Sequence, residues 1–293
     1  MTKKIFFARC NNFGDELNSV IFNSYSKESF SLSYNISKID YVGIGSILDA
    51  DILVYAPQKD VKARIKNIIK KMRAFLSFKP LITLGSGISF QYDNPLNLRF
   101  VRRMQFPIVR GAFTADVLKK SGYLKNENIV LGDIGLLASD IIPHEIIKKY
   151  PLGIVPHFRD LDNPLIWKIV EKTPGSICVN VQDSPVDVVK KIAECERIVS
   201  TSLHGLIVAD SLHIPNLWLE NPWVHYERPI NNYRFKYNDY YSALGLGSQN
   251  PVDIIDYLEK FNLEDVNRLY KISSKTIEAK KTEIRKMLNE IFR

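Results

Sequence analysis

Short apolar segments of strand length alternate with longer helical patterns through most of this chain. The first four such segments are residues 4–8, 52–55, 80–84 and 128–131. Between residues 61 and 76, apolar side chains recur with the 3.6-residue period of a helix that has one apolar face. Strands that alternate with helices favour a parallel sheet, since parallel neighbours need a crossover connection. The sequence therefore predicts an α/β fold.

A second series of the same kind follows a break near residue 150. Its strand-like segments are residues 153–156, 176–181 and 197–200, and residues 184–194 have a helical pattern. From Pro251 onward the pattern is helical throughout. A chain of 293 residues suits one large or two mid-sized domains. We predict two α/β domains with a cleft between them, at residues 1–148 and 149–250, and C-terminal helices at residues 251–293.

Positive charge is concentrated between residues 59 and 79, within a chain of net charge +8. Asp60 is the single acidic residue of this segment, against Lys59, Lys62, Arg64, Lys66, Lys70, Lys71, Arg73 and Lys79. Such a helix face suits nucleic acid, anionic lipid or a polyanionic substrate, and a solvated lysine-rich surface is the alternative. Nucleic acid is not expected as a partner, because no nucleic-acid module accompanies the charge.

The last helical pattern is amphipathic, with Ile277, Ile284, Leu288 and Ile291 on one face. It could dock on the domains or on a membrane surface. Docking on the domains is favoured, since Phe292 alone supplies the aromatic character typical of interfacial helices.

The cysteines and the N-terminus favour a cytoplasmic location. The three cysteines are far apart in the sequence and form no CxxC pair. The first apolar run is interrupted by Arg9 and is too short for a signal-peptide core or a membrane span.

The strongest local signal for chemistry is the segment 197–213, which is typical of a strand, a Ser/Thr-rich turn and a helix. Residues 200–202 can cap this helix and, with its first N–H groups and positive dipole end, hold an anion. His204 in the first turn could transfer a proton, although the helix N-terminus disfavours its charged form. A buried helix with a structural histidine is the alternative on this loop alone. His213, at the far end of the helix, is predicted to be structural.

The loop at residues 10–18 also passes from a strand to a helix, through Gly14. Its Asn12 and Asp15 suit sugar hydroxyls, and Asp15 could serve as a base. A plain N-cap beside a turn glycine is equally compatible with the pattern. The glycine-rich turns at 41–48 and 84–88 match neither a full dinucleotide-binding fingerprint nor a Walker loop.

Cations follow two segments of the second half. His157 and Arg159 end a predicted strand and could together bind a carboxylate or phosphate, the arginine through paired hydrogen bonds. A surface Arg159 paired with a neighbouring aspartate is the alternative. Arg234 and Lys236 lie among tyrosines and are further candidate anion ligands.

Taken together, these segments resemble the polysaccharide pyruvyl transferase family, from the N-terminal loop to about Gly247. The resemblance rests on the fixed order of Asn12-Phe13-Gly14-Asp15, Gly43-Ile44-Gly45-Ser46, Arg110-Gly111-Ala112-Phe113-Thr114, Gly132-Asp133 with Leu136-Leu137, Val155-Pro156-His157-Phe158, Leu203-His204-Gly205 with Val208-Ala209-Asp210, and Asp239-Tyr240-Tyr241. Chance agreement at all of these positions is improbable.

The resemblance implies a fold similar to two-domain glycosyltransferases of the GT-B type. It also implies transfer of a pyruvyl group from phosphoenolpyruvate to two hydroxyls of a sugar, forming a ketal, with no metal and no other cofactor. The expected acceptor is a saccharide of a bacterial surface polysaccharide, carried on a polyprenyl diphosphate at the inner membrane face. The lysines at 59–79 would then assist peripheral contact with an anionic membrane.

The resemblance also assigns roles to the candidate residues. His204 is expected to act as the acid/base of the reaction. The expected phosphoenolpyruvate ligands are His157, Arg159, Thr201, Ser202, Leu203, Lys236 and Arg110, although Arg110 could equally brace the cleft. Asn12 and Asp15 are expected to face the acceptor sugar. One branch of the family has an arginine where this chain has Ser202, so the anion contact is expected from other cations.

Two other functions fit the same residues. A glycosyltransferase that uses a nucleotide sugar would need the same two-domain cleft and glycine-rich turns. A non-catalytic carbohydrate-binding or scaffolding subunit could have kept the fold. A comparison of binding to phosphoenolpyruvate and to uridine diphosphate sugars would separate the first of these from a pyruvyl transferase.

Overall fold

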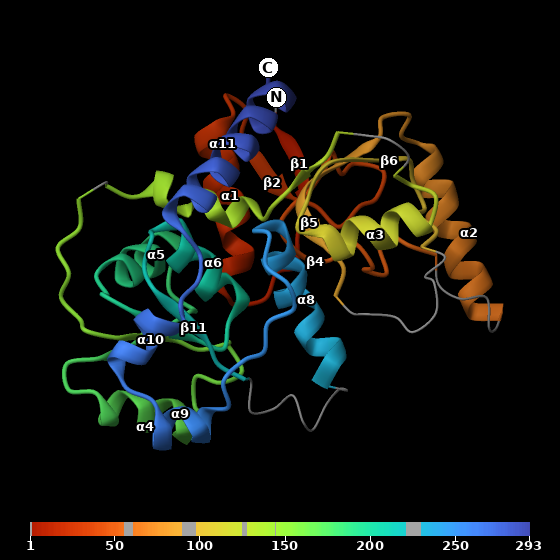
Figure 1. The fold of residues 1–293 in the computed structure, drawn as a ribbon. Coiled ribbons are helices and arrows are strands. Elements are labelled where there is room, and N and C mark those ends of the chain that lie inside the picture. The colour runs from red at the N-terminus through yellow and green to blue at the C-terminus, as the bar shows by residue number, and fades with distance from the viewer. Residues whose placement is uncertain (1, 56–60, 90–97, 125–127, 144, 221–229) are drawn as a thin grey trace.

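The computed structural model describes residues 2–55, 61–89, 98–124, 128–143, 145–220 and 230–293. Two parallel sheets, one from each half of the chain, are surrounded by helices (Figure 1). The predicted fold class is confirmed, as the chain forms two α/β units that share a cavity and ends in helices.

The first unit contains a seven-stranded parallel sheet in the order β2-β1-β3-β5-β6-β7, with β4 paired to β5. Its strands are β1 (Lys3–Phe6), β2 (Phe30–Leu32), β3 (Tyr41–Val42), β4 (Gly45–Ser46), β5 (Leu81–Gly87), β6 (Met104–Val109) and β7 (Val130–Leu131). Its helices are α1 (Phe13–Tyr25), α2 (Val61–Phe75), α3 (Ala112–Lys120) and the 3₁₀ helix η1 (Ile134–Ile141). The central strand β5 is buried at nearly every position, as expected for a strand covered on both faces.

The second unit contains a four-stranded parallel sheet in the order β11-β10-β8-β9. Its strands are β8 (Gly153–Val155), β9 (Ile177–Cys178), β10 (Ile198–Ser200) and β11 (Asn216–Trp218), and its helices are α4 (Pro164–Lys172), α5 (Pro185–Ala193) and α6 (Leu203–Ser211). The C-terminal part adds α8 (Ile230–Ala243), α9 (Ile254–Lys260), α10 (Leu263–Leu269) and α11 (Ser274–Ile291). The domain boundaries predicted at residues 148 and 250 fall in the connections before β8 and α9.

One apolar core extends through both units. It includes Phe13 at the start of α1 and Val181 after β9, and the Phe13 N–H donates to the Val181 carbonyl at 2.8 Å. A smaller core lies under the second sheet, where Ile166 of α4, Tyr257 of α9 and Val266 of α10 pack together. The first turn of α1 is therefore held directly against the second unit.

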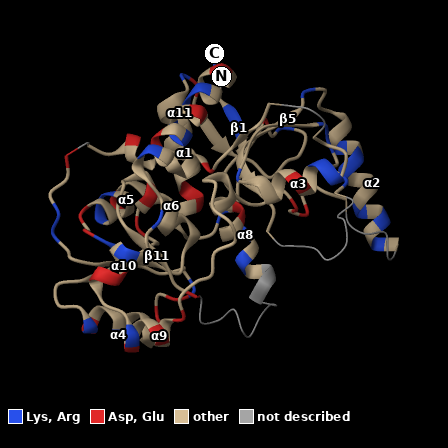
Figure 2. Cartoon of the chain, viewed as in Figure 1, with Lys and Arg blue, Asp and Glu red and all other residues tan. Residues whose placement is uncertain are grey.

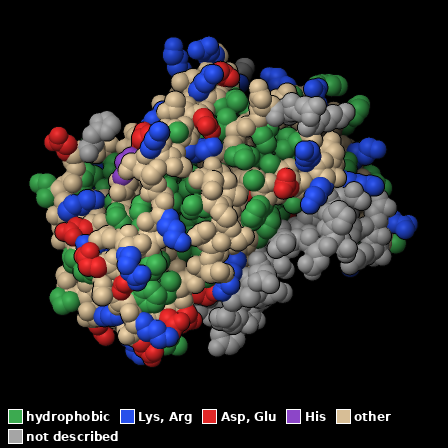
Figure 3. Space-filling view, viewed as in Figure 1, with side chains coloured by type: hydrophobic (Ala, Val, Ile, Leu, Met, Phe, Trp, Pro, Cys, Tyr) green, Lys and Arg blue, Asp and Glu red, His purple; other side chains and the backbone are tan. Residues whose placement is uncertain are grey.

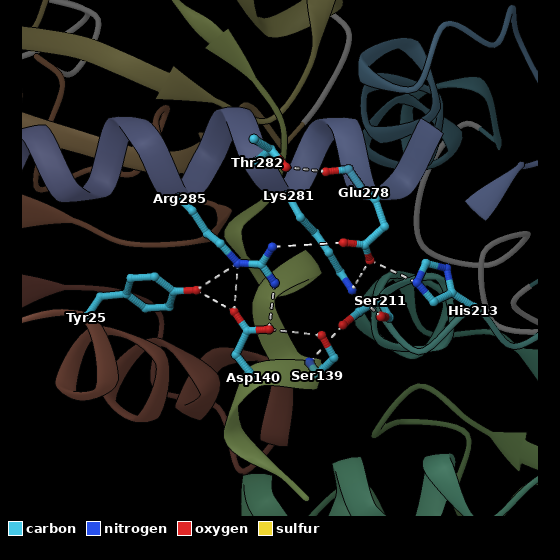
Figure 4. A network of polar contacts seen from close by, with 9 residues as sticks. All are labelled: Tyr25, Ser139, Asp140, Ser211, His213, Glu278, Lys281, Thr282 and Arg285. Atoms are coloured by element: carbon cyan, nitrogen blue, oxygen red, sulfur yellow. Dashed lines mark hydrogen bonds and ion pairs between the residues drawn. The ribbon is translucent and has the colours of Figure 1, made fainter. Parts of the chain in front are cut away.

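The C-terminal helix α11 docks on the domains, as the sequence favoured. On its apolar face Ile277, Ile284 and Leu288 are fully buried and Ile291 is partly buried. Phe292 packs edge to face against Tyr41 with ring centres 5.5 Å apart. Polar contacts join it to three other elements (Figure 4). Arg285 binds Asp140 of η1 at 2.8 Å and lies beside Tyr25 of α1, and the Lys281 Nζ donates to the Ser211 carbonyl of α6 at 2.7 Å. His213 has the predicted structural role, pairing with Glu278 at 2.9 Å.

Helix α2 forms as predicted, but its orientation differs from that of the other helices. The apolar stripe found in its sequence faces solvent, while Asn67 and Ala74 are buried against the first unit. Periodicity showed that the helix has an apolar face, and it left open which surface that face meets.

Candidate active site

A cavity of about 250 Å³ lies between the two α/β units. It opens where β1, β8 and β10 end and where α1 and α6 begin, the usual position of a ligand in such folds. Residues of both units and of α8 line it: Ala8, Asn12, Asp15, Gly45, Ser46, Ile47, Ser89, Arg110, His157, Phe158, Arg159, Ser202, Leu203, His204, Tyr233 and Lys236. The cavity therefore brings together most of the residues that the sequence assigned to a site, while Thr201 and Arg234 are not part of its lining.

The turn before α6 aims the start of that helix at the cavity. β10 ends at Ser200, whose hydroxyl accepts a hydrogen bond from the Ser202 N–H at 3.0 Å. Ser202 is the N-cap, but its side chain makes no capping hydrogen bond. Because the first N–H groups of a helix have no intrahelical acceptor, this end can receive an anion.

His204 lies in the first turn of α6 and is 8% exposed. Within the described part of the chain, its buried Nε2 atom has no hydrogen-bond partner. Buried side-chain nitrogens normally have a hydrogen-bond partner, so the Nε2 atom of His204 on the cavity wall is a candidate contact for a bound ligand. Burial, together with the charges of Lys236 and Arg110, lowers the pKa of His204 to about 3. The imidazole is therefore neutral at neutral pH.

The first turns of α1 and α6 are in direct contact beside the cavity, where Gly14 adjoins His204. A Cβ atom added to Gly14 would lie 2.1 Å from Nδ1 and 2.8 Å from Cβ of His204. Glycine is needed here for the close approach of His204, a reason that the turn interpretation of the sequence did not supply.

Replacement of Gly14 by alanine is expected to push the His204 ring out of place. We expect a loss of about 1 to 3 kcal/mol in the free energy of unfolding, as for other overpacked sites, and a large loss of any activity that uses the ring. Gly247→Ala is the control, because nothing lies within 4 Å of a Cβ at that position. Urea titrations should show a smaller loss when Gly14→Ala is made in a His204→Ala background, which removes the ring but keeps the Cβ contact at 2.8 Å. An equal loss in both backgrounds would contradict the contact.

Asp15 lines the same cavity as His204. Asn12 caps α1 by accepting from the Gly14 N–H, so Asp15 is a buried first-turn residue and not the cap. Burial raises the pKa of Asp15 to about 7, with Asn12 and the charge of Lys236 acting in the opposite direction. A carboxyl group with such a pKa can both give and take a proton at neutral pH.

The loop that follows β8 contributes His157, Phe158 and Arg159 to the lining of the cavity. The His157 N–H donates to the Thr201 hydroxyl at 2.8 Å, and this hydroxyl donates to the buried carboxylate of Asp160 at 2.8 Å. Burial, then the charges of Lys236 and Arg159, lowers the pKa of His157 to about 2. Thr201 does not line the cavity, so the structure gives it a supporting position in place of the direct donor contact that we expected.

Lys236 of α8 and Arg159 supply positive charge to the cavity. Lys236 Nζ lies 4.6 Å from the ring centre of Tyr233 and 5.2 Å from that of Tyr237. Its charge contributes to the lowered pKa values of His204 and His157. The same charge partly opposes the rise in the pKa of Asp15. These two cations are available for the anion contact that we expect from outside the Ser202 position.

Arg110 takes the bracing position that the sequence left open. Its side chain is fully buried, with Nε 2.9 Å from Asp239 of α8, Nη1 2.5 Å from the Ser46 hydroxyl and Nη2 2.7 Å from the Ile88 carbonyl. Asp239 also accepts from the Thr114 N–H at 2.8 Å and so caps α3, whose N-cap Gly111 has no side chain. The sequence places Asp239 in a motif, but it does not predict its contacts with Arg110 and Thr114, because both residues are far away in the sequence.

The other cation of the Tyr-rich segment is placed differently. Arg234 Nε lies 3.2 Å from Glu220 Oε2, and Arg234 is not among the cavity residues. Arg234 is thus paired with an acidic side chain outside the cavity, and its role as an anion ligand stays a prediction. Of the remaining cavity residues, Ile47, Ser89 and Tyr233 had been given no role, and isolated small, apolar or aromatic side chains carry no sequence signal for one.

Groups of three or more His, Cys, Asp or Glu side chains that could hold a metal ion do not occur among the described residues. The expectation that the reaction needs no metal remains a prediction. Within the same residues, none of the helices is long and apolar enough to cross a membrane.

Two parallel-sheet units share a cavity that is lined by cations, histidines and a carboxyl group. The polysaccharide pyruvyl transferase family matches residues 12–222. This match covers most of the chain, and the chain belongs to that family.

Two curated relatives are similar to the chain. The succinoglycan biosynthesis protein ExoV of Rhizobium meliloti is 26% identical over 236 residues, which are 80% of this chain and 62% of that protein. The uncharacterized protein L143 of Acanthamoeba polyphaga mimivirus is 30% identical over 175 residues, 58% of this chain and 57% of that protein. The chain thus spans 57 to 62% of the length of these relatives.

Solved structures that show some similarity to the chain include a functionally uncharacterized protein of Klebsiella pneumoniae, with a TM-score of 0.44, 15% identity and coverage of 82% of this chain and 87% of that one. The UDP-GlcNAc 2-epimerase of Methanocaldococcus jannaschii has a TM-score of 0.43 at 10% identity, with 99% and 98% coverage. The heptosyltransferase WaaC of Escherichia coli has a TM-score of 0.35 at 13% identity, with 92% and 98% coverage.

Proposed function

We propose that this chain transfers a pyruvyl group from phosphoenolpyruvate to a hexose of a surface-polysaccharide precursor, forming a pyruvate ketal and releasing phosphate. Family membership and the succinoglycan relative support the transfer. The observation that carries the proposal is the unpartnered, buried His204 nitrogen in a cavity with Lys236 and Arg159.

The cations and the start of α6 would hold the donor. Phosphoenolpyruvate has a carboxylate and a phosphate, and Arg159, Lys236 and the first N–H groups of α6 are suitable ligands for both. The same ligands would bind departing phosphate more strongly as its charge grows, which lowers the barrier.

His204 would protonate the methylene carbon of the donor. Its pKa is lowered by burial and by the charges of Lys236 and Arg110. Bound carboxylate and phosphate would offset those charges and raise the pKa, so that the imidazole gains a proton together with the substrate. Protonation of the methylene carbon leaves a positive centre at the neighbouring carbon, which a sugar hydroxyl oxygen attacks.

Asp15 would accept the proton of the attacking hydroxyl, with Asn12 beside it on the acceptor wall. The bond from carbon to phosphate oxygen then breaks, and a second sugar hydroxyl closes the ketal. The two sugar hydroxyls lose two protons in all. One proton compensates for the proton that the methylene carbon gains when it becomes a methyl group, and the other is taken up by the released phosphate. The acceptor is proposed to be linked to polyprenyl diphosphate on the cytoplasmic side of the membrane.

The test is an incubation of the full chain with phosphoenolpyruvate and a synthetic lipid-linked saccharide. We expect a mass gain of one pyruvyl ketal in the sugar and an equal amount of phosphate. Transfer of a sugar from a uridine diphosphate sugar, without binding of phosphoenolpyruvate, would contradict this proposal and indicate a glycosyltransferase. Binding of saccharide with neither reaction would indicate a non-catalytic subunit.

Replacement of Asp15 by asparagine is expected to raise stability and lower activity. The folded-state pKa of about 7 lies above the unfolded value of about 3.9, so the wild type loses stability as the pH rises from 4 to 7. The asparagine variant does not titrate there, and at pH 8 we expect it to be more stable by about 2 to 4 kcal/mol. Below pH 4 the difference should vanish.

Urea unfolding of both proteins at several pH values measures this difference. Asp116→Asn, at an exposed position of α3, is the control and should change little. A difference that does not depend on pH would show that the Asp15 carboxyl group is not protonated in the folded chain at pH 5.

A further inference from the structure

Helix α2 presents its apolar side chains to solvent. Val61, Ile65, Ile68, Ile69, Met72 and Phe75 are 44 to 77% exposed, and we call them the solvent-facing stripe. The exposed apolar surface continues beyond the helix to Leu76 and Phe78, the latter 90% exposed. Contiguous apolar patches of this kind are rare on soluble monomers and usually mark a binding surface.

The opposite side of the helix is the one that contacts the protein. At 100° per residue, Ala63, Asn67, Lys70 and Ala74 lie about half a turn away from the centre of the stripe. Asn67 and Ala74 are buried, and Lys70 Nζ donates to the Val54 carbonyl at 2.9 Å. Small and polar residues thus attach α2 to the first unit, and the usual arrangement of an amphipathic helix is reversed.

Basic residues border the solvent-facing stripe on both sides. Lys62, Lys66 and Arg73 follow one edge and Arg64 and Lys71 the other, and no Asp or Glu occurs between residues 61 and 79. Figure 2 shows this positive charge along α2, and in Figure 3 charges of both signs are mixed over α4, α9 and α10 at the other end of the molecule. An apolar centre with lysines and arginines at its edges is the pattern of helices that lie in the surface of an anionic bilayer.

We propose that α2 docks this protein on an anionic lipid bilayer, with the solvent-facing stripe in the acyl boundary and the bordering cations on the headgroups. A second copy of the chain is a poorer partner for the same face, because symmetric contact would bring two rows of cations together. Anionic lipid complements both the charge and the apolar centre.

The position of α2 gives the docking a consequence that rests on the proposed function. Ser46 and Ile47 line the cavity, and Asp51, a few residues further along, binds Lys66 of α2 at 2.6 Å. A docked α2 would hold the acceptor wall of the cavity near the membrane surface, where a lipid-linked saccharide is found.

Cosedimentation of the full chain with vesicles tests the docking without any substrate. We expect binding to phosphatidylglycerol mixed with phosphatidylcholine at low salt, and little binding to phosphatidylcholine alone. Ile68→Gln/Met72→Gln removes apolar contact without changing charge and should weaken binding at least about tenfold. Lys62→Gln/Arg64→Gln/Lys71→Gln should weaken it and reduce its dependence on salt.

Matched controls are Ile147→Gln and Ile255→Gln, which remove exposed apolar side chains elsewhere and should bind vesicles like the wild type. Circular dichroism checks that each variant is folded. Absence of vesicle binding, or unchanged binding by Ile68→Gln/Met72→Gln, would overturn the proposal, as would a dimer in solution that this variant dissociates. Pyruvyl transfer to a water-soluble acceptor should be unchanged in the α2 variants, so failure of the docking is distinguishable from failure of the enzymatic proposal.

Discussion

His204→Gln is expected to lower the rate of pyruvyl transfer by about 10²- to 10⁴-fold, the usual contribution of a general acid or base. Glutamine has similar polarity and can fill much of the same space, but it cannot carry the proton to the methylene carbon. Because Lys236 and Arg159 remain in the cavity, phosphoenolpyruvate should still bind. Phosphate release with a saccharide acceptor measures the rate, and calorimetric titration measures donor binding.

His213→Gln is the matched control, since His213 lies at the other end of α6 and contacts Glu278. This variant should transfer pyruvate normally. Phosphate release by His204→Gln at nearly the wild-type rate would remove His204 from the chemistry. Asp15 would then be the remaining proton carrier on the cavity wall with a pKa near neutrality.

Asp239→Ala is expected to lower the free energy of unfolding by about 3 to 5 kcal/mol, the usual cost of leaving one partner of a buried ion pair alone. The guanidinium of Arg110 is fully buried and would lose its countercharge. The first turn of α3 would also lose the acceptor of the Thr114 N–H. Such a loss is a large part of the total stability of a domain.

Urea unfolding followed by circular dichroism measures the loss. Asp239→Asn keeps one acceptor oxygen and serves as the second variant if Asp239→Ala does not fold. Asp253→Ala is the control, because Asp253 is an exposed N-cap of α9 whose loss should cost about 1 kcal/mol. A loss for Asp239→Ala no greater than that of the control would show that the buried pair does not contribute the expected stability.

The α/β class was predictable because its signals are local. A buried parallel strand is a short apolar run, and a helix is a 3.6-residue period, so each can be found in a dozen residues. The direction of an apolar face is not local. The stripe from Val61 to Phe75 has the same period whether it meets a sheet or solvent, and only the structure shows that it meets solvent.

The candidate site was predictable to the extent that it lies at the ends of strands. His157, Ser202 and His204 follow β8 and β10, and parallel strands place such residues at one edge of a sheet. Pairings across the chain were not predictable, since nothing in the sequence near Arg110 points to Asp239. The requirement for glycine at position 14 was not predictable either, because the His204 ring that contacts it is 190 residues away in the sequence.

The docking of α11 has a consequence for synthesis of the protein on the ribosome. The aromatic cluster of the first unit, formed by Phe22, Phe30 and Tyr41, is completed by Phe292 at the other end of the chain. At about 5 to 20 residues per second, roughly 10 to 30 s separate the emergence of β7 from that of Phe292. During this interval the nascent first unit exposes the aromatic surface that Phe292 later covers.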